Sequence, residues 1–364
     1  MINHCVPLLP GPTSVPRQYL EAYLTNYGSA DTCSEFFDLY QKNEELLQTV
    51  LHTKNQVIIM SGEGMVVLWG GMKSVLKPGD RVLCVSSGYF GDGFVDMSKT
   101  IGAEPLLISG KDRDIPDTEE VRQKAYEFKP KLITVVQGET PSGILNPIKE
   151  IGDIAKEVGA LLLCDFVSSA IGCPLYVDDW NIDIGLLGSQ KCFSLIPDLA
   201  MATVSEKAWK VIEDVNYSGY DAFLPFRTAM IKKEFPYTMN WHSHSALNLS
   251  LNDILAEGLE NIYERHAIVA KKCRDGVRAL GLEIYPLRDE ISLPTVTAVK
   301  IPPNFNIHDF LHEMEKRGVI LGGSWGKLNG IVFRVGHMGS QAKIEYIDKF
   351  LSALEDLLKN YNNK

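Results

Sequence analysis

The sequence predicts an α/β protein built on a mostly parallel sheet that carries helices on both faces. Short apolar strands alternate with helical stretches over most of the chain, and this alternation is typical of such sheets. The chain has 364 residues, which is enough for a large domain with a smaller one attached.

The strands of the large domain are expected at six apolar runs, which are Gln56–Met60, Arg81–Ser86, Lys131–Gln137, Ala160–Asp165, Ile182–Gly188 and Ala200–Ser205. Helical patterns lie between them at Gly64–Leu76, Thr118–Phe128 and Ile148–Val158. Pro78-Gly79 stands directly before a strand and indicates where the preceding helix has ended.

The pattern changes near Asn252. Asn252–Leu280 is expected to be helical, and Gly258 offers a break between two helices. Strands at Thr295–Ile301, Val319–Gly322 and Ile331–Val335 and a last helix at Ala342–Lys359 are expected to follow. We therefore predict an N-terminal segment (1–20), a large α/β domain (21–266) and a small α+β domain (267–364).

Charge and cysteine content restrict the function. The formal net charge of −10 disfavours nucleic acid and anionic membranes as partners, because both select basic surfaces. Seven cysteines without C-x-x-C spacing favour reduced thiols. Met1–Cys5 shows no basic region followed by an apolar stretch, and no apolar run approaches the roughly 20 residues that span a bilayer. We expect a soluble, cytoplasmic protein.

Two charged side chains follow neighbouring apolar strands. Asp165 ends the run Ala160–Asp165, and Lys191 follows the run Ile182–Gly188 through Ser189-Gln190. Ligands bind at the carboxyl ends of strands in open α/β sheets. This pattern is typical of enzymes that hold pyridoxal 5′-phosphate (PLP), in which the lysine binds the aldehyde as a Schiff base and the acid lies against the ring nitrogen. A lysine at a strand end is otherwise most often solvated.

Other strand ends carry groups that suit a ligand. Ser61–Met65 opens a helix and suits a phosphate, although an ordinary turn is equally consistent. Phe90 lies between glycines and is placed to stack on a planar ring, or to fill a turn in the core. Gln137–Gly143 is rich in hydroxyl and turn residues. Arg334, inside an apolar strand, requires either an internal carboxylate or that of a ligand.

The histidines do not indicate a metal site. Among His242, His244, His266 and His337 no pair is spaced i, i+4, and His242 and His244 alternate as they would on a strand or loop. We assign no metal.

Taken in order, these segments resemble the class V aminotransferases of PLP fold type I, in the branch of the alanine–glyoxylate and serine–pyruvate aminotransferases. The resemblance runs from Leu9–Thr13 to Arg334–Gly339. It is greatest to pyridoxamine–pyruvate aminotransferases, through Gly62-Glu63, Ser87–Gly91, Thr140–Gly143, Arg265-His266-Ala267 and Arg334–Gly339. It implies a PLP-binding large domain with a seven-stranded sheet, a smaller C-terminal domain, and a homodimer with shared active sites.

The resemblance also implies roles for individual residues. Lys191 would carry PLP, Asp165 would pair with its ring nitrogen, and Phe90 would stack on the ring. The other implied cofactor-binding residues are Thr140 at the phenolic oxygen, Glu63, Gly64, Met65 and Gln190 around the phosphate, and Thr238 at the phosphate of a neighbouring subunit. The implied substrate-binding residues are Arg334, for a carboxylate, with Trp325 and Tyr89.

Some positions depart from the family. Glu63 and Met65 stand where relatives often have a small residue or histidine. Trp325 stands where the pyridoxamine enzymes have a second arginine, and Phe235 stands where relatives often have tyrosine.

We therefore predict a transaminase that moves an amino group from an amino donor to pyruvate or glyoxylate by a ping-pong mechanism, with Lys191 as proton carrier. A PLP-dependent lyase that releases ammonia would use the same lysine and acid. A cysteine desulfurase is disfavoured because Val319–Arg334 contains no cysteine. A PLP-binding sensor or scaffold is disfavoured because the first strand signal begins too early for an added DNA-binding domain.

Overall fold

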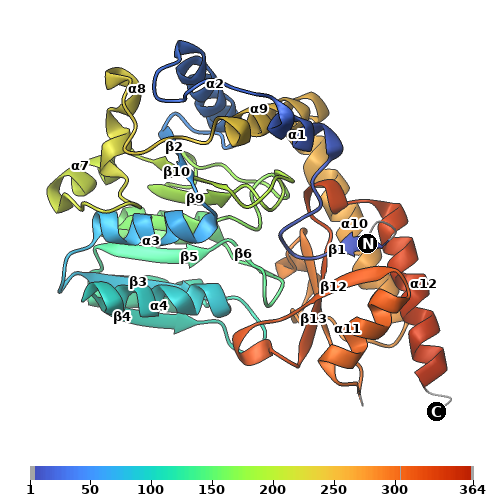
Figure 1. The fold of residues 1–364 in the computed structure, drawn as a ribbon. Coiled ribbons are helices and arrows are strands. Elements are labelled where there is room, and N and C mark those ends of the chain that lie inside the picture. The colour runs from blue at the N-terminus through green and yellow to red at the C-terminus, as the bar shows by residue number, and fades with distance from the viewer. Residues whose placement is uncertain (1–4, 304, 362–364) are drawn as a thin grey trace.

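Two sheets organise the chain (Figure 1). The computed structural model describes residues 5–303 and 305–361. Residues 1–4, on which the prediction about a secretory signal largely rests, lie outside the described residues. Among the described helices, none combines the length and apolar character that crossing a bilayer requires.

The larger sheet contains, within the described residues, seven strands in the order β2-β10-β9-β8-β5-β3-β4. Their bounds are β2 (Gln56–Ser61), β3 (Arg81–Ser86), β4 (Glu104–Ser109), β5 (Leu132–Val136), β8 (Leu161–Asp165), β9 (Ile184–Gly188) and β10 (Leu199–Val204). Only β10 runs against its neighbours, β2 and β9, and the other pairs in the described sheet are parallel. The prediction of a mostly parallel seven-stranded sheet is confirmed.

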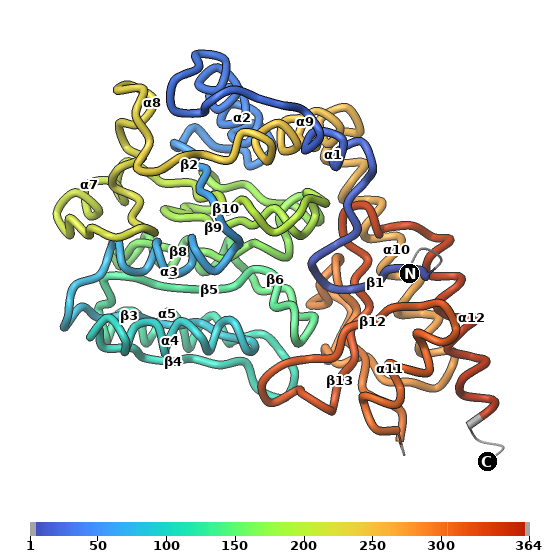
Figure 2. Tube along the Cα trace, viewed as in Figure 1, coloured from blue at the N-terminus to red at the C-terminus, as the bar shows by residue number. Residues whose placement is uncertain are grey.

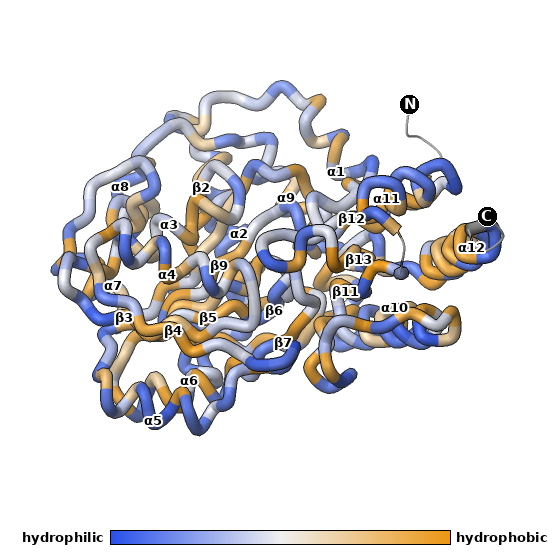
Figure 3. The backbone as a smooth tube through the Cα atoms, turned by 90° about the horizontal axis from the view of Figure 1, so that it is seen from below, coloured by the Kyte–Doolittle hydropathy of each residue, from blue (hydrophilic) through white to orange (hydrophobic). Residues whose placement is uncertain are grey.

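Helices cover both faces of this sheet (Figure 3). On one face lie α3 (Gly64–Val75) and α4 (Tyr89–Ile101), and on the other lie α5 (Thr118–Phe128) and α6 (Ile148–Val158). Strands β5, β8 and β9 are buried at every residue, which explains their continuous apolar sequences. The helix α7 (Glu206–Val215) follows β10.

Further helices lie beside the β2 edge of the sheet, as Figure 1 shows. They are α1 (Arg17–Glu21), α2 (Ser34–Val50), α8 (Ala229–Lys232) and α9 (Trp241–Glu257). Helix α2 packs on α9 through aromatic contacts, such as that between Phe36 and Trp241.

The smaller sheet has the order β1-β12-β13-β11. Its strands are β1 (Val6–Leu8), β11 (Val296–Lys300), β12 (Val319–Gly323) and β13 (Val332–Gly336), and the hairpin β6 (Gly138–Glu139) and β7 (Ile144–Leu145) forms a separate pair. Helices α10 (Leu259–Ala279), α11 (Ile307–Lys316) and α12 (Ile344–Tyr361) accompany it. The N-terminal strand β1 pairs with β12, so opposite ends of the chain share one sheet (Figure 2).

Helix α10 connects two separate buried apolar clusters. Its Ile262 belongs to the cluster around the large sheet, whereas Val269, Cys273 and Val277 belong to the cluster of the small sheet. The predicted domain boundary at residue 267 therefore falls inside one continuous helix, at the transition between the two clusters. The boundary itself stays a prediction.

Several elements differ from the expectation. The sequence patterns did not indicate β1, β4, α2 or α4. The helical break is at Gly258, as expected, with φ of +85°, but α9 begins at Trp241 because the Asn240 side chain caps it by accepting from Ser243 N. The expectation that His242 and His244 alternate on a strand or loop is wrong, since both lie in the first turn of α9.

Candidate active site

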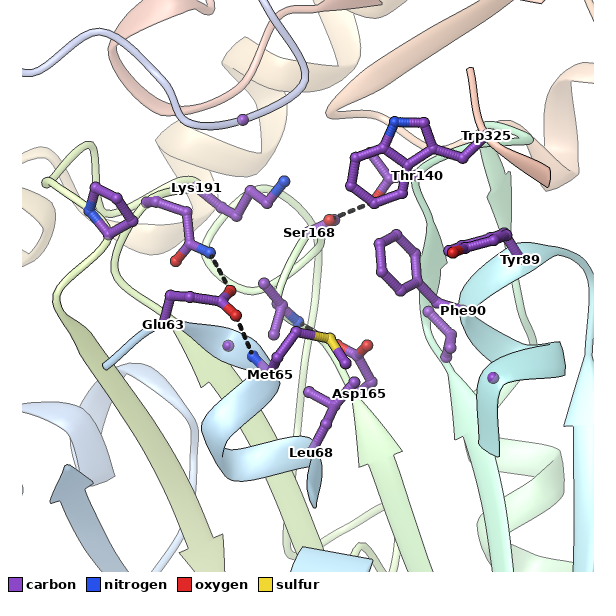
Figure 4. Close-up of a pocket in the computed structure, with 18 of the residues that line it drawn as sticks. Glu63, Met65, Leu68, Tyr89, Phe90, Thr140, Asp165, Ser168, Lys191 and Trp325 are labelled. Atoms are coloured by element: carbon purple, nitrogen blue, oxygen red, sulfur yellow. Dashed lines mark hydrogen bonds between the residues drawn. The ribbon is translucent and has the colours of Figure 1, made fainter. Parts of the chain in front are cut away.

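A cavity of about 640 Å³ lies at the carboxyl ends of the large-sheet strands (Figure 4). It brings together ten residues that the sequence singled out: Glu63, Gly64, Met65, Tyr89, Phe90, Thr140, Asp165, Gln190, Lys191 and Trp325. Their elements are far apart in the sequence, but the parallel strands end at one edge, so the side chains meet there.

Asp165 is the last residue of β8 and is buried. Its Oδ1 accepts a hydrogen bond from Val167 N at 2.8 Å. Burial raises the pKa of Asp165 to about 6, against the opposing effects of the Val167 N–H and Lys191. A buried carboxylate that lines a cavity is stabilised by a cation, and a protonated ring nitrogen would supply one.

Lys191 lies in the turn after β9, beyond Ser189, and its side chain extends into the cavity toward Ser168 (Figure 4). Its Nζ donates to the carbonyl of Pro10 at 2.7 Å. Burial and the neighbouring Arg334 lower the pKa of Lys191 to about 8, while Asp165 and other groups act in the opposite direction. A fraction of the amine is therefore neutral near pH 7 and is able to act as a nucleophile or base.

The N-terminus of α3 faces the same cavity, but the chain's own Glu63 caps it. Glu63 Oε1 accepts from Met65 N at 3.1 Å, and Oε2 accepts from Gln190 Nε2 at 3.1 Å (Figure 4). Gln190 Oε1 is buried and has no hydrogen-bond partner among the described residues. A carboxylate therefore occupies the position at which a helix N-terminus would bind another anion.

Three aromatic rings form one wall of the cavity. The centroid of Phe90 lies 5.5 Å from that of Tyr89 and 5.5 Å from that of Trp325. Phe90 packs against the buried core, whereas Tyr89 and Trp325 are half exposed at 48% and 51%. Phe90 and Tyr89 belong to the first turn of α4 rather than to an open loop.

Glu139 holds this wall in place, a role that the sequence patterns did not reveal. Its buried carboxylate accepts from Phe90 N at 3.1 Å and from Gly91 N at 3.0 Å, and so caps α4. Burial raises the pKa of Glu139 to about 7, against the lowering effect of the two N–H groups. Gly88 has no space for a side chain, because a Cβ would lie 2.6 Å from Glu139 Cγ. The one indication in the sequence was that Gln137–Gly143, a loop rich in hydroxyl residues, also contains an acidic residue, Glu139.

Thr140 lines the cavity and shares a hydrogen bond with Ser168 through their hydroxyl groups (Figure 4). Ser168 also lines the cavity and is a site residue that the sequence patterns missed, because nothing in the segment after β8 distinguishes it.

Arg334 lies on β13 and is buried. Its Nε donates to Gly323 O at 2.7 Å, and its guanidinium lies 5.7 Å from the centroid of the Trp325 ring. The sequence left two possible partners for Arg334, an internal carboxylate or the carboxylate of a ligand. In the part of the chain that the structure describes, Arg334 forms no salt bridge with an internal carboxylate. Burial lowers its pKa to about 10, while Glu139 acts in the opposite direction. This leaves the guanidinium suited to the carboxylate of a ligand.

Thr238 does not lie in this cavity. Its hydroxyl is exposed and donates to Asp31 Oδ2 at 3.0 Å. Phe235, which precedes it, packs against Phe37 and Tyr40.

The sequence profile of the class V aminotransferases matches residues 12–328, which include the cavity residues described above. This chain belongs to the class V aminotransferase family. It is therefore a PLP-dependent transaminase.

Individual aminotransferases are similar to this chain over nearly its whole length. An uncharacterized aminotransferase of Methanocaldococcus jannaschii is 35% identical over 337 residues, covering 91% of this chain and 87% of the relative. The pyridoxamine–pyruvate transaminase of Mesorhizobium japonicum is 32% identical over 327 residues, covering 87% and 82%. The structure of an alanine–glyoxylate aminotransferase from Nostoc is similar with a TM-score of 0.92 at 28% identity, covering 98% of this chain and 95% of that one.

The cavity of this class V aminotransferase fits the ring of PLP. The buried carboxylate of Asp165 suits a pyridinium nitrogen, and the Lys191 amine, with its lowered pKa, suits the aldehyde. At the other end, the N–H groups of α3 suit a phosphate only when the Glu63 carboxylate has moved off Met65 N. PLP, when bound, supplies an aromatic ring that accepts electrons from the substrate carbon.

Proposed function

We propose that this aminotransferase moves an amino group from an amino donor to pyruvate or glyoxylate, with Lys191 as its central residue. The observation that carries the proposal is that Lys191 and Asp165 line one cavity, near Arg334, which forms no salt bridge among the described residues. The names of the relatives support these acceptors, since one is a pyridoxamine–pyruvate and another an alanine–glyoxylate enzyme.

Each residue then has a defined task. Lys191 anchors the cofactor, and its amine, once displaced by the donor, carries a proton at Nζ. Asp165 keeps the ring nitrogen protonated, because a carboxylate buried beside it stabilises a positive charge. Phe90, fixed by Glu139, covers one face of the ring. Arg334 binds the carboxylate of the 2-oxo acid through the N–H groups of its guanidinium.

The remaining cofactor and substrate contacts follow from the cavity lining. We propose that Thr140 contacts the phenolic oxygen and that Gly64, Met65 and Gln190 hold the phosphate, next to Glu63. Tyr89 and Trp325 stand half exposed at the aromatic wall, where they would contact the donor side chain.

We also propose a cytoplasmic homodimer with shared active sites and no nucleic-acid partner. Thr238 lies outside its own cavity, as a residue that reaches a neighbouring phosphate must. Leu24, Tyr220 and Ile231 are exposed at 84%, 76% and 83%, and such large apolar side chains are typical of surfaces that a second subunit covers. The net charge of −10 disfavours nucleic acid.

A half-reaction screen tests the proposed reaction. The PLP-loaded protein is mixed with single amines, and the true donor bleaches the visible absorbance of the lysine-bound cofactor. Pyruvate or glyoxylate should then restore that absorbance and become alanine or glycine. Release of ammonia without any 2-oxo acid would instead identify a lyase.

One observation favours a second candidate, in which pyridoxamine itself is the amino donor. The Glu63 carboxylate takes the N–H of Met65 at the end of the cavity where a phosphate would bind, and two anions repel each other there. Pyridoxamine has no phosphate and would leave the contacts of Glu63 with Met65 and Gln190 intact. Its ring would meet the same Asp165 and Phe90.

Replacing Glu63 with glutamine should strengthen PLP binding, lowering its dissociation constant by about tenfold, which corresponds to roughly 1.4 kcal/mol. The physical reason is the removal of a negative charge beside the phosphate. The measurement is a titration of cofactor-free protein with PLP and with pyridoxal, followed by absorbance, and the gain should be confined to PLP.

The matched control for this prediction is Asp96→Asn. Asp96 lines the same cavity at its exposed α4 side, and its loss changes the charge equally. Equal gains in PLP affinity in both variants would show a general charge effect. If Glu63→Gln did not bind PLP more tightly, the argument for pyridoxamine as amino donor would lose its support.

A further inference from the structure

The segment Leu9–Ser14, here called the N-terminal strap, crosses the turn that carries Lys191. It runs from β1 in the small sheet to α1 beside the large one (Figure 2). Within the strap, Thr13 N donates to Gln190 O at 3.0 Å, and Thr13 Oγ1 donates to Lys191 O at 3.0 Å. The strap is therefore bound directly to the backbone of the lysine turn.

A second set of hydrogen bonds fixes the strap from the other side. The buried side chain of Gln341 donates to Leu9 O at 2.9 Å and accepts from Ser14 N at 2.8 Å. The same amide donates to Gly336 O at 2.7 Å, at the end of β13. Both ends of the strap are thus held by one amide group, which fixes the position of the residues between them.

The middle of the strap lies on the side chain of Lys191. Pro10 O accepts from Lys191 Nζ at 2.7 Å. Gly11 has φ of +109°, and a Cβ at this position would lie 2.2 Å from Nζ and 2.6 Å from Cδ. Only glycine leaves room for the lysine here, and only glycine adopts this backbone conformation without strain.

Several charged or titratable groups face the lysine amine from other elements. Arg334 disfavours its cation, whereas Asp165 and Glu63, and Cys192 when it is ionised, favour it. Burial raises the pKa of the Cys192 thiol, which keeps that neighbour neutral near pH 7. Among the described residues, the hydrogen-bond partner of Nζ is the Pro10 carbonyl rather than any of these side chains.

We propose that the Pro10 carbonyl holds the amine of Lys191 whenever this amine is not bound to the cofactor. Pro10 and Gly11 are then positioning residues that act through Lys191. This inference rests on the proposed function, because it takes Lys191 as the residue that binds PLP.

The carbonyl performs two tasks. It accepts an N–H from either the amine or the ammonium, so Nζ returns to one place after each displacement. Its bond to the ammonium is charge-assisted and stronger, so it favours the protonated lysine after Nζ has taken a proton. In this way the strap stabilises the lysine while it carries the proton between two atoms of the bound substrate and cofactor.

The test measures the titration of Lys191 in cofactor-free protein. The rate at which acetic anhydride acylates Lys191 is followed against pH by mass spectrometry of its peptide. In Gly11→Ala the new methyl group displaces Nζ from Pro10 O, and the ammonium loses a charge-assisted hydrogen bond. The pH midpoint should fall by about one unit. The midpoint, unlike the absolute rate, does not depend on how fast the reagent reaches the lysine, and greater exposure of the amine to water would raise the midpoint rather than lower it.

The matched control is Gly79→Ala. Gly79 also has a positive φ, of +84°, but a Cβ there would meet nothing within 4 Å. This variant carries similar backbone strain and should keep the wild-type midpoint. A wild-type midpoint in folded Gly11→Ala would overturn the proposal.

Thr13→Val provides a second variant if Gly11→Ala does not fold. It removes the hydroxyl bond to Lys191 O but leaves Pro10 and Gly11 unchanged. We expect a smaller fall in the same direction, and an unchanged midpoint would again contradict the proposal.

Failure of the proposed function gives a different result. Borohydride reduction of the wild-type protein with PLP should attach the cofactor to Lys191. Attachment to another lysine would refute the assigned role of Lys191, whereas the acylation midpoint would still report whether the strap holds its amine.

Discussion

Replacing Lys191 with alanine should stop transamination, with turnover falling by on the order of 10⁴-fold or more. The variant loses both the group that anchors PLP and the amine that carries the proton, and in this cavity no second lysine lines the described wall. The measurement is turnover with pyruvate and glyoxylate, together with the visible absorbance of the PLP-loaded protein, which should disappear.

Lys327→Ala is the matched control for this loss. Lys327 is an exposed lysine near the cavity mouth, 3.7 Å from Asp92, and its removal should leave turnover and absorbance close to wild type. A Lys191→Ala protein that remained yellow and active would refute the assignment of the site.

The second large effect is expected from Asp165→Asn, which should lower kcat by on the order of 10²- to 10³-fold. Asparagine keeps an oxygen for Val167 N, so the local backbone is preserved. It is neutral, however, and no longer holds a proton on the ring nitrogen, so the ring accepts electrons less well. Steady-state kinetics should place the loss in kcat more than in KM.

Asp183→Asn separates this effect from the general cost of removing a buried carboxylate. Asp183 is buried just before β9, where it accepts from Leu162 N, and it does not line the cavity. This variant should melt at a lower temperature but keep kcat. If Asp165→Asn kept wild-type kcat, Asp165 would not be the partner of the ring nitrogen.

The parts of the fold that the sequence predicted are those in which one physical pattern dominates. Strand β8 is buried throughout and reads as an unbroken apolar run, and Gly258 has the positive φ that breaks a helix. Strand β4 was missed because it lies at the sheet edge, is half exposed and contains Pro105. Helix α4 was missed because Gly91 and Gly93 made its first turn resemble a loop.

The same distinction holds for the site. Lys191 and Asp165 were predicted because a charged residue at the end of an apolar strand is recognisable in any sequence. The role of Glu139 was not predicted, because a carboxylate that caps a helix 48 residues away produces no recognisable pattern in the sequence around it. The Pro10 carbonyl leaves even less, since every residue has a carbonyl group and only the fold selects one of them.

The pairing of β1 with β12 determines when the strap can form during synthesis of the chain. The strap is held by β12, through β1, and by Gln341, and both leave the ribosome after the strands of the large sheet. The strands β2 to β10 that carry Asp165 and Lys191 emerge much earlier, and domains generally fold in that order. A nascent chain therefore has its acid and its lysine in place before the acceptor for the lysine amine can be fixed. Synthesis of β12 and Gln341, rather than folding of the large sheet, therefore finishes the active site.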